Sequence, residues 1–322
     1  MATTDIGVAE QASRRQTRRL KRQDRAFYWL AWGSAALVVA LLLGILLSLL
    51  WESLPSISTF GLPFLWHERW SPAKHIFGAA APIYGTLMTS LIAMVIAVPT
   101  SFGIAMFLTE ICPKPLRRPI GTAIELLAGI PSIIYGLWGF FVLAPIMQHH
   151  VQPFLLNTFG DLPVIGFLFS GAPYGIGMLT AGLVLSIMIL PFITSVTRDV
   201  FETVPVMLRE SAYGMGMTTW EVVRRIIIPY TRLGLVGGVM LGLGRALGET
   251  MAVTFVIGNS HRIAASLLAP GTTISASIAN EFAEADGKLY TSALVELGLI
   301  LFVISFTVLA LAKWLIGRTE SY

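Results

Sequence analysis

The chain has 322 residues, of which 55% are hydrophobic and only 12% are charged, and its mean hydropathy is +0.75. Soluble domains carry about 25% charged residues, so this composition excludes an ordinary soluble protein and indicates an integral membrane protein. The net charge of +4 would suit nucleic-acid binding, but the placement of the charges argues against it. The single cysteine, Cys112, excludes an internal disulfide and a cysteine-only metal cluster.

Six apolar stretches are long enough to cross a bilayer, which takes roughly 20 residues. In chain order they are residues 27–51, 83–109, 120–147, 176–200, 233–257 and 291–316. The first is too long for the core of a signal peptide, so we expect it to remain as an anchor. A kink is expected at Pro131 in the third stretch or at Pro191 in the fourth. The sequence therefore predicts an all-α integral membrane protein with six transmembrane helices.

Lysine and arginine are unevenly distributed among the segments that join these stretches. The N-terminal tail, the loop at 110–119, the segment at 198–232 and the C-terminal end together carry 17 of the 22. The remaining segments carry four: Arg69, Lys74, Arg262 and Lys288. Because cytoplasmic loops are enriched in lysine and arginine, we expect both termini in the cytoplasm.

The resulting organisation has five parts. They are a basic cytoplasmic tail (1–26), the first transmembrane helix (27–51), an outer loop (52–82), a core with five helices (83–316) and a cytoplasmic tail (317–322). The basic N-terminal tail is expected to contact anionic lipid, which explains its charge without nucleic acid.

The charged stretch ESAYGMGMTTWEVVRRIIIPY lies between the fourth and fifth apolar stretches. Gly214 and Gly216 interrupt a helical pattern, and Thr218 followed by Glu221 is the arrangement of an N-terminal capping box. Pro229 is expected to end the second helix before the next span. The segment 205–229 is thus predicted to form two short helices with a glycine turn, a shape that suits insertion into a groove on a partner.

The fifth apolar stretch combines small residues with two charges. Gly234, Gly238 and Gly242 recur every four residues, a spacing that allows close helix packing. Arg245 and Glu249 are also four apart and are expected on one helical face. An arginine near mid-membrane costs about 2.5–3.5 kcal/mol on insertion scales, so it is expected to face a cavity or a counter-ion.

The planar guanidinium group suits tetrahedral oxyanions, and we therefore expect Arg245 to contact an anionic substrate. Glu249 is expected to pair with Arg245 when the path is empty; the alternative is a purely structural pair. Two further acids lie in apolar stretches, Glu125 in the third and Glu296 in the sixth. Each is costly in a membrane unless protonated or paired. Both are candidates for the path or its gating, with helix packing favoured for Glu296.

Several motifs of catalytic chemistry are missing from the sequence. It contains no G-x4-G-K-[ST] motif for ATP, no HExxH motif and no cluster of metal ligands within the spans. It also shows no internal repeat of the kind found in many secondary transporters. We therefore expect a non-catalytic chain that binds no metal and no cofactor.

The stretch from Glu210 to Pro229 resembles the EAA loop of ABC-importer permeases, whose consensus is E-A-A-x3-G-x9-I-x-L-P. The matching residues are Glu210, Ser211, Ala212, Gly216, Ile226, Ile228 and Pro229. Ser211 and Ile228 are mild departures from the consensus. In that family the loop forms a coupling helix that docks into a cleft on a cytoplasmic ATPase. The resemblance implies this role for Glu210, Ser211, Ala212, Gly216, Ile226 and Pro229.

Further blocks between residues 80 and 300, such as IELLAGIPSIIYGLWG and GLGRALGETMAVTFVIGN, are similar to PstC-type permeases of phosphate-specific ABC importers. The resemblance implies the type I importer permease fold, the bacterial inner membrane as location and inorganic phosphate as substrate. It implies several partners: a homologous PstA-type permease, two PstB-type ATPases that use ATP and Mg, and a PstS-type phosphate-binding protein. A phosphate sensor kinase is a further partner that the resemblance suggests.

Two alternatives stay open at this point. Arg245 alone does not distinguish phosphate from other oxyanions, so a sulfate or molybdate importer fits equally well. An ATP-independent anion transporter is the second alternative, although it would not need the coupling loop.

Overall fold

A computed structural model describes residues 2–163 and 165–319 and the side chains of residues 21, 23–163 and 165–314. Within that part of the chain every named element is a helix, and one isolated β-bridge joins Ser71 and Ile76. Six helical segments are long and apolar enough to cross a membrane: Gln23–Phe60, Ala80–Ile111, Ser132–Phe159, Met178–Glu202, Thr219–Gly248 and Lys288–Trp314. The prediction of an all-α protein with six spans is confirmed. The basic side chains predicted at 14–19 and residues 320–322 of the predicted C-terminal tail lie outside the described residues.

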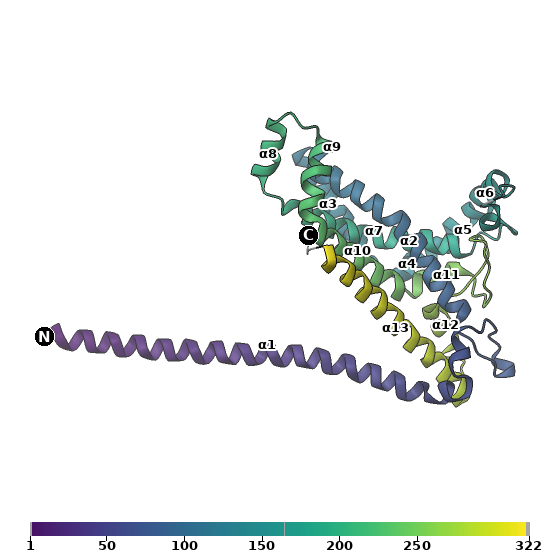
Figure 1. Ribbon diagram of the computed structural model, residues 1–322, viewed down its shortest axis with the longest axis horizontal. Helices are drawn as coiled ribbons and strands as arrows, with labels where there is room; N and C mark the ends of the chain where they lie inside the picture. Colours follow the sequence, from purple (N-terminus) through teal and green to yellow (C-terminus); the bar gives the residue numbers. More distant parts are fainter. Residues whose placement is uncertain (1, 164, 320–322) are drawn as a thin grey trace. The chain divides into compact units, whose positions relative to one another are not determined.

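The chain divides into two compact units, residues 1–52 and 53–322. The first unit is the larger part of α1 (Ala2–Phe60), the purple helix of Figure 1. Its backbone is one continuous helix across the boundary predicted between the tail and the first span. From Phe27 to Leu50 most of its large apolar side chains are exposed within the structure, as expected of a helix that is solvated by lipid.

The second unit contains the remaining elements. Two long helices that begin near its loop-rich end are α2 (Ala80–Met106) and α7 (Met178–Glu202). The others are α3 (Lys114–Ala128), α4 (Ser132–Trp138), α5 (Ala144–Ile146), α6 (Gln152–Phe159), α8 (Val206–Gly214), α9 (Thr219–Val222), α10 (Ile228–Gly248), α11 (Met251–Ile257), α12 (Ile274–Glu281) and α13 (Lys288–Thr319). Short 3-10 or π-type turns, which include η3 (Phe107–Ile111) and η7 (Val223–Ile227), extend several of them.

The core of the second unit is built around α7. This helix packs along α2 and also against α10, α3 and α11 (Figure 1). The glycines at 234, 238 and 242 of α10 face Val200, Val196 and Ile193 of α7, so closely that an added Cβ would lie 2.6–2.9 Å from those side chains. The predicted close packing through the glycine stripe is therefore confirmed, and its partner is a helix of the same chain.

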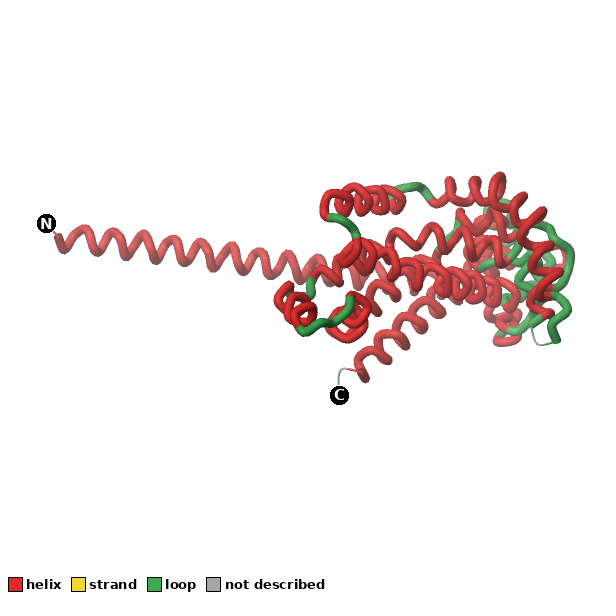
Figure 2. Tube along the Cα trace, turned by 90° about the horizontal axis from the view of Figure 1, so that it is seen from above, coloured by secondary structure: helices red, strands yellow, loops and turns green. Residues whose placement is uncertain are grey.

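The two ends of the second unit differ. Figure 2 shows most of its loops in green at one end, which lies at the right of that view. The helices α8 and α9 lie at the other end, near the far ends of α2 and α7 (Figure 1). We call these the loop end and the coupling end.

Two predicted spans are wrong in their boundaries because the helices break. The helix predicted at 120–147 ends at Ala128 and restarts at Ser132, with Pro131 between the two parts. Proline lacks a backbone N–H and disfavours helical geometry in the residue before it. The helix predicted at 233–257 ends at Gly248 and restarts at Met251. By contrast, α7 continues through Pro191 without a break.

Pro229 was predicted to end a helix, and this is also wrong. Helical structure continues from Thr219 through η7 and α10 to Gly248. Pro229 lies in the first turn of α10, directly after the π-type turn Val223–Ile227. A π-type turn changes the local hydrogen-bond pattern, and this lets the chain accommodate a proline in the following turn.

Candidate functional site

The coupling end has the first short helix and the glycine turn that the sequence predicts, but its second helix is the start of the run that continues to Gly248. The helices α8 and α9 are separated by a turn in which Gly216 has a φ of +85°. At the start of α9 the Thr218 hydroxyl accepts a hydrogen bond from the Glu221 N–H (3.4 Å), and the Glu221 carboxylate accepts one from the Thr218 N–H (3.0 Å). This reciprocal capping box fixes the direction in which the helix leaves the turn.

The six residues assigned to ATPase coupling occupy different environments. Glu210, Ser211 and Gly216 are exposed, whereas Ala212 is buried against Phe201, Val204 and Val222. Ile226 and Pro229 lie on the continuous helix rather than in the turn.

Around these residues a set of large apolar side chains is exposed: Val206, Met207, Leu208, Tyr213, Met215 and Trp220. Met207 on α8 is 77% exposed. Contiguous exposed apolar surface on a polar rim is typical of a protein interface. These side chains give the coupling end an exposed apolar surface, and Ala212 is buried beneath it.

A buried ion pair anchors α8, and sequence reasoning missed it. Arg209 lies 2.8 Å from Glu110 of η3, measured from Nη1 to Oε1, and the two side chains are 17% and 5% exposed. Arg209 also donates a short hydrogen bond to the Phe201 carbonyl at the end of α7. No local pattern pairs two residues so far apart in sequence, although an acid at the end of an apolar span was a signal that could have been followed.

Arg245 lies in the last turn of α10 and its side chain is exposed. Among the described side chains it has no ion pair. It lies close enough to Tyr135 of α4 to act on the phenol group electrostatically. The Tyr135 hydroxyl donates a hydrogen bond to the Leu127 carbonyl (2.8 Å), which links the two sides of the α3–α4 break.

Glu249 does not lie on one helical face with Arg245, contrary to expectation. The helix ends at Gly248, and Glu249 has an extended conformation with φ −71° and ψ 130°. The expected Arg245–Glu249 pair is therefore not formed in this structure. Instead the Glu249 carboxylate accepts a hydrogen bond from the Ala252 N–H (3.4 Å) at the start of α11. Its backbone carbonyl accepts one from the Ser275 hydroxyl (2.7 Å) of α12.

The helices that follow the two breaks, α4 and α11, pack against each other. At Gly136 of α4 an added Cβ would lie 2.9 Å from the Met251 carbonyl oxygen of α11. Irregular backbone at membrane depth is tolerated only where it is enclosed by protein or lines a water-filled cavity. Interrupted helices of this kind are also typical of substrate sites in transporters. Arg245 lies in the last turn of α10, directly before one of these breaks.

Glu125 was expected to be buried in the third span, and this expectation is wrong. It lies on α3, which begins with charged residues, and its side chain is 47% exposed. It forms an ion pair with Arg198 of α7 (2.7 Å). The Arg198 side chain crosses Gly121, where an added Cβ would lie 2.7 Å from the guanidinium group. Glu125 thus holds α3 against α7.

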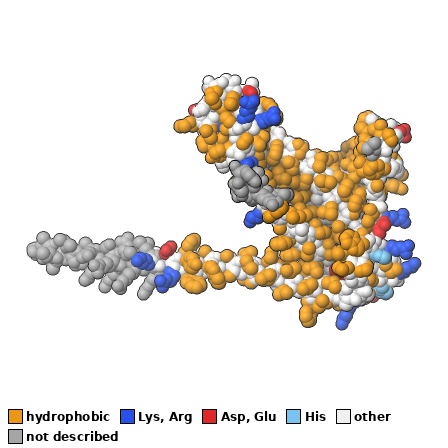
Figure 3. All heavy atoms as spheres, viewed as in Figure 1, with side chains coloured by type: hydrophobic (Ala, Val, Ile, Leu, Met, Phe, Trp, Pro, Cys, Tyr) orange, Lys and Arg blue, Asp and Glu red, His pale blue; other side chains and the backbone are white. Residues whose placement is uncertain are grey.

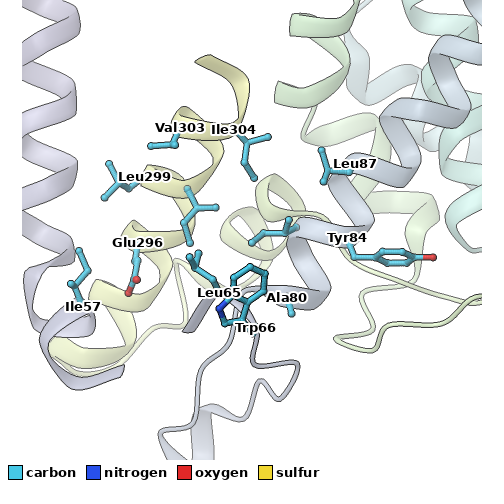
Figure 4. A pocket seen from close by; sticks show the side chains of 12 residues that line it. Ile57, Leu65, Trp66, Ala80, Tyr84, Leu87, Glu296, Leu299, Val303 and Ile304 are labelled. Carbon is cyan, nitrogen blue, oxygen red and sulfur yellow. The ribbon is translucent and has the colours of Figure 1, made fainter. Parts of the chain in front are cut away.

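Glu296 lies on α13 beside an apolar groove of about 640 Å³ (Figure 4). Its side chain projects toward Ile57 in the last part of α1, and the residue is only 6% exposed. Two fully buried serines, Ser53 and Ser56, lie on the same part of α1. The other residues that line the groove are hydrophobic, such as Leu299 and Val303. This environment fits helix packing, the role favoured from the sequence, better than an anion path.

At the loop end, four side chains form a network. The Glu281 carboxylate accepts hydrogen bonds from Trp70 Nε1 and from the Tyr290 hydroxyl, both 2.6 Å long. His261 Nε2 lies 3.5 Å from the other Glu281 oxygen, and the His261 ring stacks on Trp70 with centroids 5.3 Å apart. Burial lowers the pKa of His261, and the nearby Glu281 opposes this shift. The network joins the loop before α2, the loop after α11 and the end of α12.

Comparison with known proteins identifies the family. A model of the family described as "Binding-protein-dependent transport system inner membrane component" matches residues 79–321. The "Phosphate transport system permease protein PstC" of Mesorhizobium japonicum is 62% identical over 304 residues, which cover 94% of this chain and 93% of that protein. The protein of the same name from Pasteurella multocida is 60% identical over 301 residues, which cover 94% and 92%.

A solved structure supports the same fold. A chain in the crystal structure of a bacterial alginate ABC transporter, in complex with an alginate pentasaccharide-bound periplasmic protein, is 16% identical to this chain. The two superpose with a TM-score of 0.58 over 89% of this chain and 95% of that chain. At this level of identity the likeness shows the fold alone, which is that of an ABC importer permease.

The fold and the relatives agree on a multi-pass inner-membrane protein that is the non-catalytic permease of an ABC transporter. The family match extends over the helices that carry the coupling end, the two helix breaks and Arg245. The chain therefore belongs to the family of binding-protein-dependent transport system inner membrane components, and within that family to the PstC permeases.

Proposed function

We propose that this chain is one of two permeases in an ATP-driven importer of inorganic phosphate and that Arg245 contacts the anion as it crosses the membrane. The observation that carries the proposal is the position of Arg245, a cation without an ion pair among the described side chains, at the junction of two interrupted helices. Relatives that are 55–62% identical are phosphate transport system permeases, which supports phosphate as the anion.

At Arg245 the chain supplies a positive charge and a planar set of donors. The guanidinium group can donate two parallel hydrogen bonds to two oxygens of a tetrahedral anion. The Tyr135 hydroxyl lies on the same side and already donates to the Leu127 carbonyl. Because Glu249 is held by the start of α11, its carboxylate is turned to a backbone N–H and does not neutralise the arginine. Glu125 contributes at a distance by fixing α3 on α7 next to the α3–α4 break.

The coupling end would dock on a PstB-type ATPase dimer, and ATP and Mg would bind to that partner. In this proposal Glu210, Ser211 and Gly216 meet the partner with the exposed apolar side chains of α8, and Ala212 supports them. Ile226 and Pro229 carry the movement into α10. The Glu110–Arg209 pair ties α8 to the ends of α2 and α7, so a displacement of the docked helix reaches the bundle.

The remaining partners follow from the same arrangement. A PstA-type permease would complete the path beside Arg245, because the exposed side of this arginine needs an enclosing surface. A PstS-type phosphate-binding protein would dock at the loop end, and both termini would lie in the cytoplasm. The uneven distribution of lysine and arginine supports this orientation.

An importer of another oxyanion and an ATP-independent anion transporter are the competing functions. The exposed apolar surface on α8 and α9 favours a chain that is driven by a docked partner. Sulfate competition and dependence on ATP separate these alternatives in one assay.

Uptake of radiolabelled phosphate at micromolar concentration, in cells that lack other phosphate importers, tests the proposal. The wild type is compared with Arg245→Gln, Gly216→Arg and the exposed control Lys313→Gln, with membrane levels of each measured. We expect both functional variants to be present but inactive, Lys313→Gln to be active and sulfate not to compete. Normal uptake by Arg245→Gln would contradict the anion contact, and inhibition by sulfate would contradict the assignment of phosphate.

A further inference from the structure

A cation-lined feature also lies at the loop end. It is a cavity of about 640 Å³ whose lining includes Glu68, Arg69, Trp70, Lys74, His261 and Arg262. The first four belong to the loop before α2, and the last two belong to the loop after α11. Figure 3 shows lysine, arginine and histidine side chains gathered at the right-hand edge of the second unit, separate from the cations around α8 and α9. We call it the outer cavity.

Positively charged side chains outnumber negatively charged ones among the residues that line the outer cavity. Arg69, Lys74 and Arg262 have no ion pair among the described side chains. Glu68 also lines the cavity, and its carboxylate accepts a hydrogen bond from the Ile263 N–H (2.7 Å) but keeps its negative charge, so the lining carries an excess of two positive charges. Three like charges around one hollow repel each other over distances shorter than the Debye length. An anion in the hollow would relieve this repulsion.

The base of the outer cavity is held in place. Trp70 and His261 stack with their ring planes 7° apart, and both contact Glu281, which also accepts a hydrogen bond from Tyr290. The stack fixes the loop before α2 against the loop after α11. The cations on the two loops are therefore presented by a preorganised base, which lowers the entropic cost of binding.

A short helix connects the outer cavity to the helix break beside Arg245. At one end of α12 the Ser275 hydroxyl donates to the Glu249 carbonyl (2.7 Å). Further along, the Ser277 hydroxyl lies 3.3 Å from His261 Nε2, and Glu281 lies at the other end of the helix. An eight-residue helix is about 12 Å long. The outer cavity thus lies one short helix away from the proposed anion contact.

We propose that the outer cavity is a receiving site for an inorganic oxyanion, which is hydrogen phosphate in the importer proposed above, and that the anion is held here before it reaches Arg245. This proposal rests on the proposed function. Arg69 and Arg262 would donate hydrogen bonds to the anion oxygens, and Lys74 would act as a point charge. The cavity exceeds the size of one anion, so the anion keeps part of its water shell and exchanges readily.

A small anion suits these observations better than the acidic surface of a docked protein. The cations surround a hollow with an aromatic base, whereas a protein partner is expected to meet a flatter surface with charges on the rim. Acidic side chains of the phosphate-binding protein are the competing occupant, and the experiment separates the two.

Equilibrium dialysis of radiolabelled inorganic phosphate against the intact importer in lipid nanodiscs, without the binding protein, tests the proposal. The variants are Arg69→Gln with Arg262→Gln, Arg245→Gln, and the control Lys288→Gln, a cation of the same end that does not line the cavity. The affinity of each complex for the phosphate-binding protein is measured in parallel. We expect saturable phosphate binding that the double variant weakens by about tenfold or more. Lys288→Gln should leave this binding unchanged, whereas Arg245→Gln should lose only the contribution of the contact at Arg245 and keep the component that the double variant weakens.

Three results would overturn the proposal. They are an absence of phosphate binding to the wild-type importer, loss of binding only in Arg245→Gln, and weakened docking of the binding protein in the double variant with unchanged phosphate binding. Failure of the proposed function would be seen differently, as an absence of phosphate uptake by the wild type in cells. An importer that transports phosphate but shows no dialysis signal therefore rejects the receiving site alone.

Discussion

Arg209 of α8 and Glu110 of η3 form an ion pair with 2.8 Å between Nη1 and Oε1, and it joins the coupling end to the transmembrane bundle. Breaking a buried pair leaves an uncompensated charge, at a cost of about 3 kcal/mol. We expect Glu110→Gln and Arg209→Gln each to lower the thermal stability of the purified complex and to reduce phosphate uptake more than ATP hydrolysis. A double-mutant cycle on the melting temperature measures the coupling between the two side chains.

The exposed pair of Arg225 with Glu221, whose atoms lie 3.9 Å apart, provides the matched control. Exposed pairs contribute little to stability, so Arg225→Gln should melt like the wild type. Additive effects of Glu110→Gln and Arg209→Gln in the double variant would contradict a direct interaction.

Gly216 has a φ of +85°, a conformation that side-chain-bearing residues rarely adopt. No atom lies within 4 Å of an added Cβ, so the restriction is conformational rather than steric. A non-glycine residue there costs about 1–2 kcal/mol, and least for asparagine. We expect Gly216→Val to lose more uptake than Gly216→Asn. Gly214→Ala, two residues away with open space and no positive φ, should be neutral when uptake is compared at equal membrane levels.

Gly85 of α2 allows the loop after α11 to approach the helix. An added Cβ would lie 1.9 Å from the Thr272 carbonyl oxygen, which belongs to the backbone and cannot rotate away. Overpacking of this kind costs about 3 kcal/mol. We expect Gly85→Ala to reduce the amount of protein in the membrane and its melting temperature. Gly103→Ala on the same helix, where no atom lies within 4 Å, should accumulate normally; equal losses in both would contradict the argument.

Burial lowers the pKa of His261 from its ordinary value of 6.5, against the opposing effect of Glu281. The folded state therefore binds fewer protons than the unfolded state as the pH falls below about 6.5. The contribution of neutral His261 is complete above that pH and is lost as the pH falls toward the lowered pKa. We expect the melting temperature of the complex to fall between pH 7 and pH 5, and to fall less in His261→Gln. The exposed control His149→Gln should follow the wild type.

Features with a local cause could be predicted from the sequence. The six spans follow from apolar length, since about 20 residues cross a bilayer whatever their neighbours are. The capping box of Thr218 and Glu221 involves two residues within one turn and formed as predicted. The glycine stripe of α10 predicted close packing, although the spacing alone did not identify α7 as its partner.

Features that depend on distant contacts could not be predicted. The sequence is apolar on both sides of the helix break at Glu249, so it gives no sign of the break. The break is stabilised by hydrogen bonds with Ser275 of α12 and with the start of α11. Glu125 was placed in a membrane span because an amphipathic surface helix can contain as many apolar residues as part of a span. Its partner Arg198 lies on another helix, so the local sequence does not identify the ion pair. The pairing of Glu110 with Arg209 likewise has no local signal.

One unbroken helical run, from Thr219 to Gly248, connects the coupling end to the proposed anion contact. Its 30 residues extend over about 45 Å at 1.5 Å per residue. The capping box lies at the start of this run, and Arg245 lies near its other end. A tilt of about 5° at the docked end would move the far end of the run by about 4 Å, which exceeds the length of a hydrogen bond. In the proposed importer, a small tilt of the docked end would therefore move Arg245 far enough to make or break a hydrogen bond to the anion.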